Sequence, residues 1–92
     1  MRSVTVALDL PSQYLELCAK LEKACDELMA LHRQEQDLTI RYDRAVASGR
    51  RTFLYNLRLK LTAVSGVKIY FTEYVKKLAQ DVQLLEDQLG SL

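Results

Sequence analysis

The apolar positions of the chain fall into three successive patterns. Residues 3–10 alternate strictly, with apolar side chains at Val4, Val6, Leu8 and Leu10. A period of two predicts a half-buried β-strand over this stretch. Because no second strand-like segment follows, such a strand would pair with another chain. The alternatives are an extended arm over residues 1–10 or a first turn of helix.

From residue 10 onward the apolar period changes to that of a helix pair. The first stripe comprises Leu10, Tyr14, Leu17, Leu21, Ala24, Leu28, Leu31, Glu35, Leu38, Tyr42 and Ala45, and the second comprises Leu54, Leu57, Leu61, Val64, Lys68, Phe71, Val75, Leu78, Val82, Leu85 and Leu89. Steps of three and four in alternation are typical of a coiled-coil seam. We therefore predict helices over residues 12–47 and 52–89.

The segment between the stripes, residues 48–51, predicts a tight turn. Gly49 suits the left-handed residue that ends a helix, and Thr52 can cap the next one. At the start of the first helix Pro11 is tolerated, and Asp9 or Ser12 supplies a capping oxygen. A short connection makes the two helices antiparallel.

The two stripes mirror each other through this turn. Each residue of the first stripe faces the residue of the second whose number adds to its own to give 99, so that Ala45 faces Leu54 and Leu38 faces Leu61. The fold class predicted is therefore all-α: one domain over residues 1–92, an antiparallel coiled-coil hairpin. Gly66 follows Ser65 within the second helix, where a kink is an alternative to a continuous helix.

Glu35 and Lys68 are the two charged residues in the stripes, and the register places them in adjacent layers. One interpretation is an ion pair that fixes the register at some cost in stability. The alternative is that each side chain extends outward to water independently.

Apolar residues outside the stripes predict a second packing surface. Together with Val4, Val6 and Leu8, the candidate interface residues are Leu15, Cys18, Cys25, Met29, Leu59, Ile69, Tyr70 and Tyr74. A helix with an apolar surface wider than one seam normally packs against two neighbours. We expect two hairpins to form a homodimeric four-helix bundle, the alternative being one hairpin docked on the helices of another protein.

Composition narrows the classes of function. The 92 residues are 49% hydrophobic and 27% charged, with a net charge of +1, so net charge gives no argument for nucleic acid or membrane binding. Two cysteines and the absence of a leader or spanning segment predict a cytoplasmic protein, with the nucleus as the alternative.

Charge is unevenly distributed along the hairpin. Residues 41–68 contain seven cationic residues against Asp43 alone, a local charge of +6, whereas residues 9–40 carry −4 and residues 69–92 carry −2. The cations nearest the turn are Arg41, Arg44, Arg50, Arg51, Arg58 and Lys60. This basic tip could contact nucleic acid, anionic lipid or an acidic patch of a protein. The alternatives are a solvated turn whose arginines pair with local carboxylates and head-to-stem packing between hairpins.

No catalytic or metal constellation accompanies these features. Cys18, Cys25 and His32 are spaced by seven residues, about 10 Å along a helix, too far apart to share one metal or, for the cysteines, to form a disulfide within one chain. We therefore expect a non-enzyme with no cofactor and no small-molecule substrate.

The helix–turn–helix layout of residues 15–90 resembles the antiparallel coiled-coil fingers that bind small GTPases. The resemblance rests on the heptads and on the leucine-rich second helix with Leu78, Val82, Leu85 and Leu89. It implies a small GTPase as partner. From the residues themselves we expect a protein–protein interaction module, a scaffold or adaptor in a larger assembly, with polyanion binding by the tip as the alternative.

Overall fold

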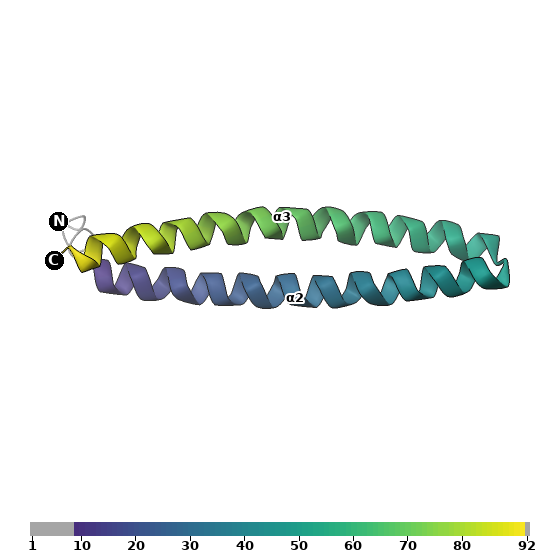
Figure 1. Cartoon of the computed structure of the whole chain (residues 1–92), viewed down its shortest axis with the longest axis horizontal. Coiled ribbons are helices and arrows are strands. Elements are labelled where there is room, and N and C mark those ends of the chain that lie inside the picture. The colour runs from purple at the N-terminus through teal and green to yellow at the C-terminus, as the bar shows by residue number, and fades with distance from the viewer. Residues whose placement is uncertain (1–8, 92) are drawn as a thin grey trace.

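The protein is a hairpin of two long helices. The computed structural model describes residues 9–91 and contains α2, Leu10–Ser48, and α3, Arg51–Gly90. The helices run antiparallel and side by side over their whole length (Figure 1), and the rod measures 65 × 26 × 14 Å. The predicted all-helical hairpin is confirmed. There is no strand within residues 9–91.

The beginning of α2 follows from its capping residue. The Asp9 carboxylate accepts a hydrogen bond from the backbone N–H of Ser12 at 3.4 Å, and Pro11 lies in the first turn. Because Asp9 caps the helix, α2 begins at Leu10, two residues before the predicted start. The predicted strand is wrong at Leu10, which is helical, and its remaining positions Val4, Val6 and Leu8 lie outside the described residues.

The turn between the helices is built on Gly49. Its φ of 71° is left-handed, as predicted, and its N–H and that of Arg50 reach back to the last carbonyls of α2. The prediction for the next helix start was wrong. Arg50 is the N-terminal cap of α3 and makes no side-chain capping bond, while Thr52 already lies inside the helix.

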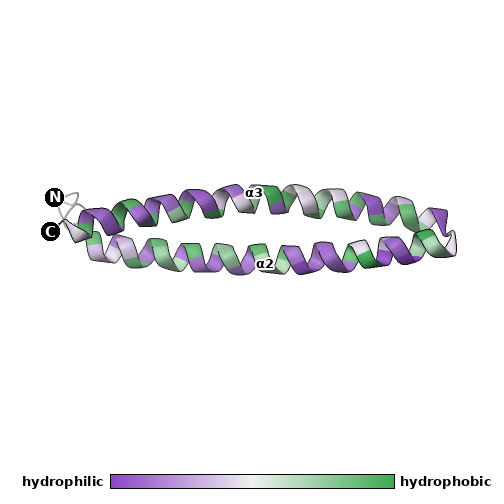
Figure 2. Ribbon diagram, in the orientation of Figure 1, coloured by the Kyte–Doolittle hydropathy of each residue, from purple (hydrophilic) through white to green (hydrophobic). Residues whose placement is uncertain are grey.

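The core is a single seam between the helices. Every residue of the two predicted stripes is buried or half-buried. Hydrophobic and hydrophilic bands alternate along both ribbons, as expected for helices with one apolar stripe (Figure 2). At the end near the turn, Leu38, Ala45 and Leu57 form a buried cluster, and Leu61 packs against it. Leu38 and Leu61 therefore share a cluster, as the register predicted.

The second helix is continuous. α3 runs through Ser65 and Gly66 without interruption, and no atom outside the helix's own backbone lies within 4 Å of the place that a Cβ on Gly66 would occupy. In the described part of the chain, neither helix is long and apolar enough to cross a membrane.

Candidate functional site

A polar layer interrupts the apolar seam near the middle of the rod. Lys68 Nζ lies 2.7 Å from Glu35 Oε1, so the ion pair suggested by the sequence is present. Ser65 Oγ donates to Glu35 Oε2 at 2.6 Å, and Lys68 Nζ lies 3.0 Å from His32 Nδ1. The hydrogen bond from Lys68, followed by that from Ser65, holds the pKa of Glu35 below its ordinary value. Four side chains from both helices thus join in one network, in which Glu35, Ser65 and Lys68 are half-buried and His32 is exposed.

A second polar contact joins the helices near the chain ends. The Tyr14 hydroxyl donates to Glu86 Oε2 at 2.7 Å. This bond, with a smaller contribution from Cys18, raises the pKa of Tyr14 to about 12. The phenol therefore stays protonated and keeps donating at neutral pH.

The seam divides the remaining surface of the hairpin into two sides. We name one the cysteine face: it carries the residues that directly follow every second seam residue of each helix, namely Cys18, Cys25, His32, Thr39 and Val46 on α2 and Arg58, Ser65, Thr72, Ala79 and Glu86 on α3. A shallow groove of about 330 Å³ lies on it, between Met29 and His32 of α2 and Thr72 of α3. Leu15 and Ile69 lie on the same side of the hairpin, further from the seam than the residues of this set.

We name the opposite side the tyrosine face. A groove of about 410 Å³ there is lined by Lys20, Lys23 and Glu27 of α2 and by Tyr74 of α3. Helical periodicity adds Tyr70 to the same side. Charged residues recur beside the seam on this face: Lys20, Glu27, Arg41, Lys60 and Asp81.

The structure therefore does not bring all the predicted interface residues together. Leu15, Cys18, Cys25, Met29 and Ile69 share the cysteine face, whereas Tyr70 and Tyr74 lie on the opposite side. Leu59 follows neither flank and lies on the outer side of α3. Cys18 and Cys25 are free thiols, both half-buried. One partner cannot cover the whole predicted set through one face.

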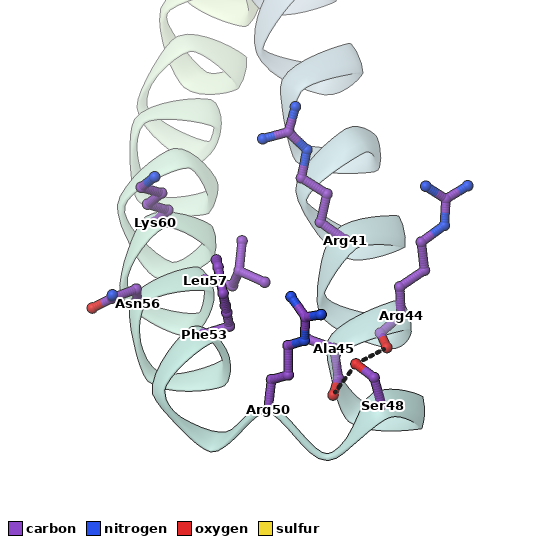
Figure 3. A pocket seen from close by; sticks show the side chains of 9 residues that line it. All are labelled: Arg41, Arg44, Ala45, Ser48, Arg50, Phe53, Asn56, Leu57 and Lys60. Carbon is purple, nitrogen blue, oxygen red and sulfur yellow. Dashed lines mark hydrogen bonds between the residues drawn. The ribbon is translucent and has the colours of Figure 1, made fainter.

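The tip, residues 41–60, carries the six predicted cations on both faces. Arg41, Arg44, Arg50 and Lys60 line a groove of about 350 Å³ on the tyrosine face (Figure 3), and Arg51 and Arg58 line another of about 360 Å³ on the cysteine face. Arg41 is paired with Asp37 at 3.1 Å. Within the described residues, the other five cations have no carboxylate within 4.0 Å.

The sequence shows Phe53 and Tyr55 beside the arginines of the tip, but not the grooves that they help to line. Phe53 contributes an aromatic wall to the groove, and the Arg50 guanidinium lies 5.7 Å from the centre of its ring. Tyr55 and Val46 are also exposed at this end. Their position just outside the seam stripes, close to the arginines, was the available signal.

The described residues form no candidate metal site. Within residues 9–91, no group of three His, Cys, Asp or Glu side chains is placed to hold a metal ion. Comparisons with protein-family models, curated proteins and solved structures each found no match. Binding to a small GTPase stays a prediction.

Proposed function

We propose that the protein is a non-enzymatic interaction module that self-associates through its cysteine face and serves as a scaffold or adaptor. The observation that carries this proposal is the thinness of the core. Among residues 9–91, seven hydrophobic residues are buried, no side chain is less than 2% exposed, and twelve large hydrophobic residues are 38–67% exposed. Two helices alone leave much apolar surface in water, which favours packing against further helices.

The character of the two faces indicates which one is covered. Beside the seam, the middle of the cysteine face carries uncharged or weakly polar residues, and its charged residues Arg58 and Glu86 lie towards the two ends of the rod. The tyrosine face has charged residues at five of its positions beside the seam, spread along the rod: Lys20, Glu27, Arg41, Lys60 and Asp81. Interface centres are depleted in charge, so the cysteine face is the better docking surface.

A second copy of the hairpin fits this face in size and in charge. The rod offers a side of 65 by 26 Å, more than the roughly 800 Å² per partner of a standard interface. On α3 the residues flanking the seam change from Arg51 and Arg58 near the turn to Glu86 near the chain ends. Two copies related by a two-fold axis across the rod would place these arginines opposite the partner's Glu86 end. An antiparallel homodimer, with four helices in cross-section, follows.

Two isoleucine substitutions test the proposal. Ile69 on the cysteine face is 66% exposed, and Ile40 on the outer side of α2 is 50% exposed. We expect Ile69→Glu to shift the protein from dimer to monomer in sedimentation equilibrium with the helical circular dichroism retained. The matched control Ile40→Glu should keep the dimer.

Two results would oppose the proposal. A native chain that stays monomeric at all concentrations would remove self-association. A dimer that Tyr70→Glu disrupts and Ile69→Glu does not would move the interface to the tyrosine face.

A further inference from the structure

We infer that the tip of the hairpin is a docking end for an anionic lipid surface, with the rod standing away from the bilayer. This goes beyond the proposed self-association, which leaves Arg44, Arg50 and Lys60 on the tyrosine face uncovered. The starting observation is the state of the tip cations. Arg44, Arg50, Arg51, Arg58 and Lys60 have no carboxylate partner within the described residues.

The lysines that pair on the rest of the rod provide the contrast. Lys68 is bound to Glu35 at 2.7 Å, and Lys77 to Asp81 at 3.0 Å. Within the described residues, Lys20, Lys23 and Arg33 have no ion pair either, but they lie in a segment, residues 9–40, whose net charge is −4. At the tip, nearby carboxylates do not compensate the positive potential, which therefore attracts an external anion.

The arrangement of these cations favours an extended surface over a small anion. They lie on both faces of the hairpin, and the charged ends of Arg41, Arg44, Arg50 and Lys60 are spread around their groove and do not converge on one point (Figure 3). All six lie within about 15 Å of the turn along the helices. A charged plane at the end of the rod acts on all of them, because this distance is comparable with a Debye length of about 10 Å.

Exposed apolar side chains at the same end favour lipid over nucleic acid. Val46, Phe53, Tyr55 and Leu59 are each more than half exposed. Aromatic and aliphatic side chains interleaved with cations are typical of segments that lie at a membrane interface. The contact is at the surface and not across the bilayer, in agreement with helices too polar to span it.

The charge of the remaining rod would orient the protein. Residues 9–40 carry −4 and residues 69–92 carry −2. An anionic surface repels this end while it attracts the tip. For a single hairpin, end-on binding is therefore favoured over binding along the side of the rod.

Vesicle flotation tests the inference. We expect the native chain to bind phosphatidylcholine vesicles that contain about 30 mol% phosphatidylserine at about 0.1 M salt, and to be released at about 0.5 M salt. Arg44→Gln combined with Arg50→Gln should lower the partition coefficient roughly thirtyfold, since each basic residue at such a surface contributes about a factor of five. The matched control, Lys20→Gln with Lys23→Gln, removes the same charge from the far half of the rod and should bind like the native chain.

Orientation gives a second readout. In an Ile69→Glu chain with Cys18→Ser and Cys25→Ser, in which no partner copy lays its chain ends beside the tip, an environment-sensitive dye attached to Ser48→Cys should shift to the blue with these vesicles, and a dye at Ser91→Cys should not. The inference is overturned if the native chain ignores anionic vesicles, if the two double variants lose binding equally, or if the dye at residue 91 responds instead. Binding to duplex DNA without binding to vesicles would also overturn it and assign the tip to nucleic acid.

Discussion

The tip of the hairpin and the rest of the rod use charged residues in opposite ways. In the rest of the rod, polar groups join the two helices: Lys68 binds Glu35 at 2.7 Å, and Tyr14 donates to Glu86 at 2.7 Å. At the tip no such bond crosses between helices; Arg41 pairs within its own helix, with Asp37. The two helices are held together there by Leu38, Ala45 and Leu57. Apolar packing closes the tip, and its cations are left available to an external partner.

The largest effect should come from the cluster that closes the tip. Leu38 is 6% exposed, so Leu38→Asp would bury a carboxylate without a partner, at a cost of about 3–5 kcal/mol. We expect loss of most of the helical signal in circular dichroism. Ile40→Asp, at a position that is 50% exposed on the same helix, is the control and should unfold near the native temperature. Equal effects of the two substitutions would contradict the register.

Glycines at the tip and in the middle of α3 should respond with opposite sign. Gly49→Ala places a Cβ on a residue with φ of 71° and should lower the free energy of unfolding by about 1 kcal/mol. Gly66→Ala lies within a helix, with open space around the added Cβ, and should raise it by about 0.5–1 kcal/mol. Chemical denaturation at one fixed protein concentration measures both. A destabilising Gly66→Ala would indicate that this position is covered by a partner.

The Glu35–Lys68 layer should contribute more to register than to stability. Replacing both residues by leucine completes the apolar seam, and we expect a higher melting temperature together with additional sets of amide resonances from alternative packing. Lys68→Leu alone should lower the melting temperature, because it leaves Glu35 half-buried without its cation. A double variant that is less stable than the native chain would show that the pair is a net source of stability.

The smallest effect is a pH dependence from the same layer. The pKa of Glu35 is lowered in the folded state, so its contribution to stability is complete above the unfolded value of about 4.3 and disappears as the pH falls through the folded value. Glu35→Gln should therefore flatten the fall in melting temperature between about pH 5 and pH 3. An unchanged profile would mean that other carboxylates cause the fall.

Much of this fold is predictable because a two-helix rod is governed by one period. The seam and the neighbouring positions of Glu35 and Lys68 follow from spacing alone, and the left-handed conformation at Gly49 follows from the residue type. The helix starts do not, because Asp9 and Ser12 are both good caps and only backbone geometry selects Asp9. Thr52 likewise has a capping side chain, yet the chain re-enters the helix before it.

The division into two faces was partly accessible from the sequence. Cys25 follows the seam residue Ala24, whereas Tyr74 precedes the seam residue Val75, which places them on opposite flanks of their helices. The predicted interface was based on apolar character and did not use the side of the helix, so it placed Cys25 and Tyr74 in one set. The groove between Arg50 and Phe53 depends on the path of the turn, and side-chain directions at a turn are not fixed by helical spacing.

The solution mass of the native chain is the most direct test of self-association through the cysteine face. If a second copy covers the cysteine face, light scattering over a range of concentrations should give about twice the 10.6 kDa of one chain. A mass of 10.6 kDa at every concentration, with the helices intact, would contradict self-association.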